Sequence, residues 1–120
     1  QADGGTRCAS ITGAFIALML AMKKLKKDKL IKEIPVRDYV AAISVGVVGG
    51  KNYLDLDYSE DSEADVDMNI IKTGTGGFVE IQGTAEREPF SDKQMKAMLT
   101  LADKGIKQLV AIQKKAIGTL

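Results

Sequence analysis

The sequence predicts an α+β domain in which a helix, four strands and a second helix follow one another along the chain. Three observations predict this fold class. Apolar residues recur at helical spacing near both ends, whereas the middle of the chain alternates apolar and polar residues with a period of two. Glycine-rich turns separate the middle segments, as in antiparallel hairpins. The 120 residues form one domain, in which we expect the helices to lie on one face of the sheet.

The first helix is predicted from about Cys8 to Lys27. Ile11, Phe15 and Leu18 belong to a series of apolar residues at helical spacing, and alanines fill the other faces. Such a helix is expected to pack inside the domain. A run of lysines closes it, either as a solvated end that favours the helix dipole or as an RNA contact, and we favour the solvated end.

The four predicted strands are 38–48, 53–57, 65–73 and 78–84. The first is a nearly unbroken apolar run, which is typical of a strand buried on both faces. Residues 49–52 form a hairpin turn, and residues 59–64 form a crossing loop or a single helical turn. The glycines of 74–77 indicate a hairpin turn rather than a dinucleotide-binding loop, because a strand and not a helix follows them.

The last helix is predicted from Asp92 to about Ile117. Ser91 and Gln94 have the spacing of a capping box at its start. Gly118 suits the residue that ends it.

Composition excludes several classes of function. The chain has no His, which removes Ser-His-Asp catalysis and the commonest zinc ligand, so proton transfer must use carboxylates, Lys or Tyr. The single Cys8 cannot form an internal disulfide, and a cytoplasmic location is expected. The longest apolar run, around 14–22, is too short to cross a bilayer, so no membrane partner is expected.

The loop from Asp3 to Arg7 leads directly into the first helix. Its two glycines allow close backbone approach, the first helical amides point outward, and Arg7 offers a planar set of donors suited to phosphate. These features predict an anion site. The alternative is a helix start capped by Asp3 or Thr6, with Arg7 on the surface.

The segment 54–69 is rich in Asp and Glu, and apolar residues alternate with acidic ones at its two ends. Crowded carboxylates indicate a bound cation or a retained proton, although the solvated face of an antiparallel sheet gives the same pattern. An EF-hand does not fit, because Glu60 replaces the required Gly and Val66 the closing Glu. A Mg²⁺ site is easier to meet, and Asp61 and Asp67 are its candidate ligands.

Several motifs, in order along nearly the whole chain, resemble a known family. They are ADGGTR followed by ASITGAF, then LDLDYSEDSEADVDMN, then TGTGGFVEIQGTAEREPFS. The resemblance is to the C-terminal half of the ribonuclease PH family, phosphorolytic exoribonucleases related to polynucleotide phosphorylase and exosome ring subunits. It implies a ribosomal protein S5 domain 2-like fold and a homo-oligomeric hexameric ring, a trimer of dimers. The implied activity trims tRNA 3′ ends with inorganic phosphate as co-substrate and releases nucleoside diphosphates.

The resemblance also implies roles for single residues. Gly5, Thr6 and Arg7 match the phosphate-binding motif, and Asp61 and Asp67 match the carboxylates of Mg²⁺ binding and acid catalysis. We favour Asp67 as the acid. Residues 1–120 are then the C-terminal half of a ribonuclease PH-like protein, and an N-terminal half or a second chain is expected as a partner. One alternative is a non-catalytic RNA-binding subunit of an exosome-like ring, and another is a small Mg²⁺-dependent phosphatase.

Overall fold

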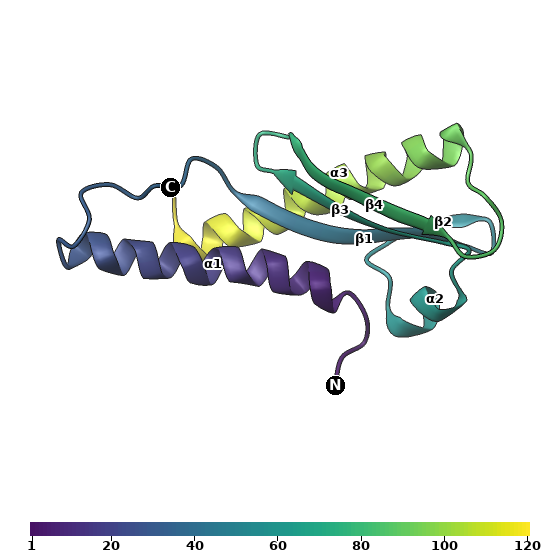
Figure 1. Cartoon of the computed structure of the whole chain (residues 1–120), viewed down its shortest axis with the longest axis horizontal. Helices are drawn as coiled ribbons and strands as arrows, with labels where there is room; N and C mark the ends of the chain where they lie inside the picture. The colour runs from purple at the N-terminus through teal and green to yellow at the C-terminus, as the bar shows by residue number, and fades with distance from the viewer.

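The computed structural model describes residues 1–120, and its helices and strands follow the predicted order (Figure 1). The elements are α1 (Thr6–Lys27), β1 (Val40–Val48), β2 (Lys51–Leu54), α2 (Tyr58–Glu63), β3 (Val66–Thr73), β4 (Phe78–Ala85) and α3 (Asp92–Ile117). The strands form one four-stranded antiparallel sheet in the order β2-β1-β3-β4. This confirms the predicted α+β fold, and the crossing segment is the short helix α2.

The hairpin between β1 and β2 is tighter than the sequence predicted. Its turn consists of Gly49 and Gly50, whose φ angles are 57° and 78°, as a two-residue type I′ turn requires. β2 therefore occupies Lys51–Leu54 and not the predicted segment 53–57. The strand ends where it does because Asp55 has a φ of 59°, a left-handed conformation that interrupts the ladder.

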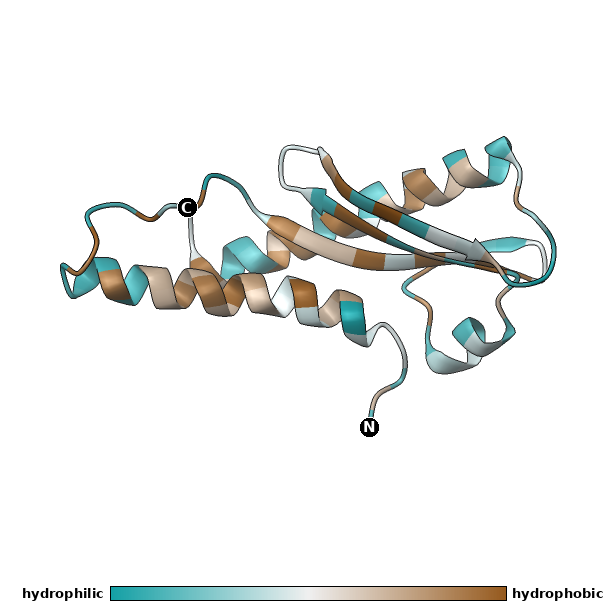
Figure 2. Cartoon of the chain, in the orientation of Figure 1, coloured by the Kyte–Doolittle hydropathy of each residue, from teal (hydrophilic) through white to brown (hydrophobic).

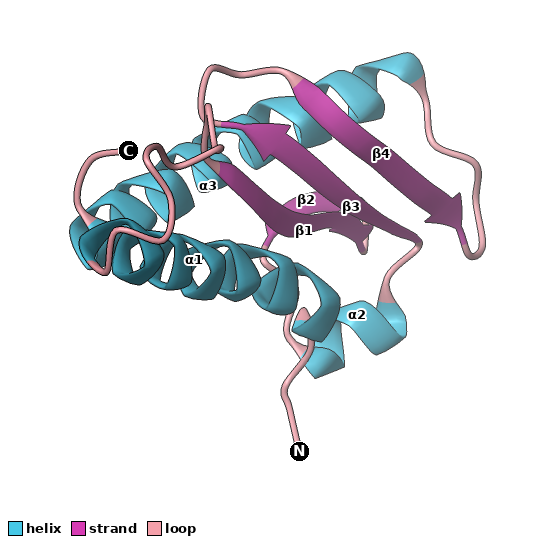
Figure 3. Ribbon diagram, turned by 60° about the vertical axis from the view of Figure 1, so that its left-hand side comes forward, coloured by secondary structure: helices cyan, strands magenta, loops and turns pink.

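α3 covers one face of the sheet, over β1, β2 and part of β3 (Figures 1 and 3). It approaches closely at Gly105, where a Cβ atom would lie 2.5 Å from Cδ1 of Ile43. The predicted capping box of Ser91 and Gln94 is present at its start, and Gly118 follows its last residue. The sequence therefore predicted both ends of this helix correctly.

α1 lies along the edge of β1 that β2 leaves free. β2 pairs only with residues 45–48 of β1, so the backbone groups of Val40 and Ala42 need other partners. The Thr12 hydroxyl accepts a hydrogen bond from Ala42 N (3.0 Å) and donates one to Ala42 O (3.3 Å). Gln113 of α3 donates from Nε2 to Val40 O (2.8 Å) and to Thr12 O (3.1 Å). The structure thus differs from the expected layer of helices on one face, because α1 closes a sheet edge instead.

α1 packs on one side only, whereas the sequence predicted a helix inside the domain. Its buried residues are Cys8, Thr12, Phe15 and Met19, but Leu20 is 51% exposed. Figure 2 shows apolar residues gathered along the middle of this helix. Taken whole, α1 is long and apolar enough to cross a membrane, which the shorter run 14–22 did not suggest. A core helix of a soluble protein passes the same test, so the finding is weak support for a membrane span.

Candidate active site

The start of α1 is held against the segment before α2 by two glycines. Gly4 has a φ of 96°, and a Cβ atom there would lie 2.9 Å from the carbonyl oxygen of Leu56. Gly5, with a φ of 64°, is the N-cap, and no side chain caps the helix. Asp3 accepts a hydrogen bond from Tyr58 N (3.3 Å) instead of capping α1. The alternative of a helix capped by Asp3 or Thr6 is therefore wrong.

The first turn of α1 has the properties of an anion site. Its first helical hydrogen bond runs from Ala9 N to Gly5 O (2.9 Å), so the preceding amides of the turn have no partner within the helix. Free amides and the positive end of the helix dipole favour a bound anion. The Arg7 guanidinium stands in the same turn and is half exposed.

Two carboxylates approach this turn from α2 and β3. Asp57 begins α2 with a capping box, in which its Oδ1 accepts from Glu60 N (2.8 Å), and this short helix carries Asp61. Along β3, Val66 and the next even-numbered residues face the core, as the predicted period of two requires. Asp67 therefore points to the opposite face, on the side of α2 and the start of α1.

These residues meet in a small pocket of about 150 Å³, which we call the Asp67 pocket. It is lined by Gly5, Thr6, Arg7, Cys8, Ser44, Leu56, Asp61, Asp67 and Asn69. This pocket contains every site residue that the sequence predicted. They are the three residues of the phosphate-binding motif and the two aspartates. The fold thus brings residues 5–7 together with carboxylates about sixty positions further along the chain.

The Asp67 carboxyl group is electrostatically unusual. Burial raises the pKa of Asp67 to about 6 from an ordinary value of 3.8. The neighbouring Asp61 adds to this increase through a hydrogen bond and its charge, and Glu86 adds a smaller contribution through its charge. A carboxyl group with a pKa near 6 still holds a proton in part of its population at neutral pH, as a general acid must.

The same carboxylates suit a divalent cation by their chemistry. No group of three or more His, Cys, Asp or Glu side chains is arranged for a metal ion. Mg²⁺ needs only one or two carboxylates, with water and substrate phosphate as its other ligands. Asp61 and Asp67 supply that number, and a cation beside them would offset the charge repulsion that adds to the effect of burial on the pKa of Asp67. The residues present therefore fit Mg²⁺.

Sequence reasoning missed the partner of Arg7. Its Nη2 donates to Oε2 of Glu80 on β4 at 2.7 Å, so this arginine is paired. Two further hydrogen bonds connect α1 to β4 through β3. Cys8 Sγ donates to Asn69 Oδ1 (3.4 Å), and Asn69 Nδ2 donates to Gln82 Oε1 (3.4 Å). The alternation of β4, which places residues 80 and 82 on one face, was the available signal.

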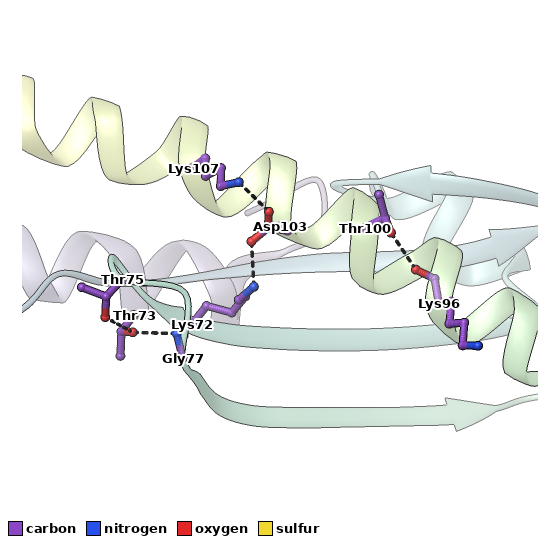
Figure 4. Close-up of polar contacts among 8 residues, drawn as sticks. All are labelled: Lys72, Thr73, Thr75, Gly77, Lys96, Thr100, Asp103 and Lys107. Carbon is purple, nitrogen blue, oxygen red and sulfur yellow. Dashed lines mark hydrogen bonds and ion pairs between the residues drawn. The ribbon is translucent and has the colours of Figure 1, made fainter.

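A larger pocket, of about 350 Å³, lies on the other side of β3, between α3 and the turn before β4. We call it the Asp103 pocket. Asp103 accepts from the buried Lys72 (2.7 Å) through one oxygen and pairs with Lys107 (2.8 Å) through the other (Figure 4). The hydrogen bond from Lys107, followed by that from Lys72, holds the pKa of Asp103 below its ordinary value.

The glycine-rich turn of the Asp103 pocket offers no free backbone donors. Amides 73, 74 and 76 donate to backbone carbonyl oxygens, amide 77 donates to the Thr73 hydroxyl, and amide 75 donates to the Asp38 carboxylate. The turn joins β3 to β4 as the sequence predicted. Because its polar groups are satisfied internally, this pocket is better explained as part of the scaffold than as an anion site.

The fold and the pocket together define the class of protein. It is an α+β domain in which the N-terminus of a helix faces two carboxylates, one of them on a strand of the sheet. The chain belongs to the 3′ exoribonuclease family, because residues 38–105 match the model of domain 2 of that family. It is 58% identical over 118 residues to Ribonuclease PH of Syntrophomonas wolfei subsp. wolfei, a match covering 98% of this chain and 49% of that protein.

Among solved structures, the crystal structure of rice (Oryza sativa) Rrp46 has a similar fold. The TM-score is 0.78 at 15% sequence identity, and the match covers 98% of this chain and 50% of that one. At this identity the likeness concerns the fold alone. The chain spans about half the length of both proteins to which it is similar.

Proposed function

We propose that the protein to which this chain belongs is a phosphate-dependent 3′-to-5′ exoribonuclease that trims tRNA 3′ ends and releases nucleoside diphosphates. The observation that carries the proposal is the Asp67 pocket, where a carboxyl group with a pKa of about 6 faces the free amides of a helix start and Arg7. The identity of 58% to a protein named Ribonuclease PH supports the same activity.

In the proposed reaction, inorganic phosphate is the nucleophile. The amides of the first turn of α1, around Gly5 and Thr6, hold it together with Arg7, and so orient one of its oxygens toward the last phosphodiester of the RNA. A bond forms between that oxygen and phosphorus, and the bond from phosphorus to the 3′ oxygen of the preceding nucleotide breaks. The products are a nucleoside diphosphate and an RNA shortened by one nucleotide.

Asp67 is the proposed general acid. It gives its proton to the leaving 3′ oxygen, and in the reverse reaction it takes the proton from an RNA 3′ hydroxyl. Its raised pKa suits both directions, because the protonated and the ionised forms are both populated near neutral pH. Burial favours the proton on Asp67, and the nearby Asp61 adds to this effect through a hydrogen bond and its charge.

Asp61 and Asp67 are the residues that would hold Mg²⁺ in this proposal. When bound, the ion would neutralise charge on the scissile phosphodiester. Removal of divalent cations with a chelator should therefore reduce turnover, and added Mg²⁺ should restore it.

The partners are proposed from the family as well. RNA 3′ ends are the substrate, and the assembly is a homo-oligomeric ring, a hexamer built as a trimer of dimers, completed by an N-terminal half or second chain. Val79 and Ile81, which are 61% and 44% exposed on the edge strand β4, support a further partner surface. The alternative is a non-catalytic RNA-binding subunit of such a ring. It would have the same partner surface but no exoribonuclease activity.

The test uses the active native protein that contains this chain, with an RNA that has an unpaired 3′ end. Shortening of the RNA should require inorganic phosphate, and the released nucleotides should be diphosphates. Release of monophosphates without phosphate would instead indicate hydrolysis. RNA binding without any shortening would favour the non-catalytic subunit.

A further inference from the structure

Glu80 places a negative charge against the residue proposed to bind phosphate. It lies on β4, paired in register with Ile71 of β3, and its side chain is 33% exposed. Its Oε2 accepts from Arg7 Nη2 at 2.7 Å, across 73 positions of sequence. Arg7 is the one basic residue that forms an ion pair with Glu80. The ion pair therefore joins β4 to α1 through Arg7, which lines the Asp67 pocket.

A carboxylate and a phosphate compete for the same guanidinium. Arg binds phosphate best through two parallel N–H groups of its planar fork, and Glu80 already occupies one N–H of Nη2. If phosphate used the remaining N–H groups, two anions would share one cation and would repel each other. In either arrangement, the charge of Glu80 opposes the binding of phosphate.

We propose that Glu80 is an internal competitor for Arg7, which phosphate must displace or oppose in order to bind. Glu80 is then a positioning residue that sets the affinity for phosphate, with no part in the chemical step. The ion pair gives the charge of Arg7 a partner that phosphate must replace. This inference rests on the proposed function, because it assumes that phosphate binds at Arg7.

The test compares Glu80→Gln with the wild type in the active native protein. Glutamine keeps the shape of the side chain and removes its charge, so the KM for inorganic phosphate should fall about two- to fivefold, the range typical of a partly exposed ion pair. The KM for RNA should not change. A merely structural role of Glu80 would not lower one KM selectively.

Two further variants control this comparison. Glu88→Gln removes the same charge from an exposed glutamate beyond β4 and should leave the KM for phosphate unchanged. Glu80→Asp retains the charge on a shorter side chain, so its KM for phosphate should stay closer to that of the wild type than the Glu80→Gln value does.

Two results would overturn the proposal. An unchanged KM for phosphate in Glu80→Gln would mean that Glu80 does not compete, and a raised KM would mean that it holds Arg7 in place for phosphate. Arg7→Ala separates this failure from a failure of the proposed function. If Arg7→Ala weakens phosphate use and Glu80→Gln does not strengthen it, only the inference about Glu80 fails. If neither variant changes phosphate use, the phosphate site itself is wrong.

Discussion

Two pockets on opposite faces of β3 are each lined by an aspartate and at least one basic residue, but the two aspartates differ in the charges that act on them. Asp103 receives hydrogen bonds from two lysines, and its pKa is lowered. Asp67 lies beside a second carboxyl group in a partly buried position, and its pKa is raised to about 6. The Asp103 pocket stabilises the ionised form of its aspartate, whereas the Asp67 pocket favours the protonated form.

The difference teaches that pocket size is a poor guide to chemistry in this protein. The Asp103 pocket has a volume of about 350 Å³, more than twice the 150 Å³ of the Asp67 pocket. Its turn and its ion pairs are nevertheless satisfied internally. The smaller pocket holds the free amides of a helix start and a perturbed carboxyl group, which are the features that reactions require.

Asp67→Asn should have the largest effect on activity and separates the two pockets most clearly. The substitution keeps the shape and removes the proton, so turnover should fall about 10²- to 10⁴-fold in both directions of the reaction. Phosphate-dependent release of nucleoside diphosphate and its reverse measure this. The matched control is Asp103→Asn, which makes the same chemical change in the Asp103 pocket and should leave turnover close to that of the wild type. An equal loss of turnover in the two variants would contradict the proposed difference between the two pockets.

Arg7→Ala should have the next largest effect. It removes the guanidinium from the Asp67 pocket, so the apparent affinity for phosphate should fall about ten- to a hundredfold. RNA binding should change less. Steady-state kinetics with phosphate and RNA varied in turn measure the two affinities. Impaired RNA binding with unchanged phosphate dependence would move Arg7 to the RNA site.

The smallest effects concern stability, and the two aspartates should differ in sign. At pH 7, Asp103→Asn should lower the free energy of unfolding by about 1 kcal/mol, because the substitution removes the charge that pairs with Lys72. The loss stays small because Asn still accepts a hydrogen bond from Lys72. The lowered pKa of Asp103 means that this loss should shrink as pH falls through and below the ordinary value of 3.8. Urea denaturation at several pH values measures both changes.

Asp67→Asn should instead raise the free energy of unfolding at pH 7. A raised pKa means that ionised Asp67 destabilises the folded state, and this cost appears between pH 3.8 and about 6 as pH rises. Because the residue is partly exposed, solvent screening reduces the gain from its removal to about 1–2 kcal/mol. The gain should vanish below pH 4. A loss of stability at pH 7 would mean that Asp67 has structural partners.

The sequence predicted the order of elements because the spacing of apolar residues indicates which side of a helix or strand is buried. The alternation of β3 placed Asp67 away from the core, and the capping box of Ser91 and Gln94 located the start of α3. The end of β2 could not be predicted in the same way. It depends on a left-handed conformation at Asp55, and the sequence does not indicate such a conformation at a residue other than glycine.

The exposure of α1 could not be predicted because its apolar residues surround the helix and do not indicate a preferred face. Its place at the edge of β1 depends on how short β2 is, and on Thr12 and Gln113 as backbone partners. These are long-range contacts without a local signal.

The residues of the candidate site were proposed from motifs, and the crowded carboxylates indicated a cation or a retained proton, but the contacts behind these properties could not be predicted. The pairing of Arg7 with Glu80 needs the register of β3 and β4 and the position of α1. The raised pKa of Asp67 needs its burial and the approach of Asp61 from α2. Both properties arise only when distant segments meet.

The most direct test of the contrast between the pockets is the titration of the Asp67 carboxyl group by NMR, with its signal assigned by its loss in Asp67→Asn. Without divalent cations, we expect a midpoint near pH 6, well above that of Asp103 in the same spectra. A midpoint for Asp67 at or below the ordinary value of 3.8 would contradict its proposed role as the proton donor of this pocket.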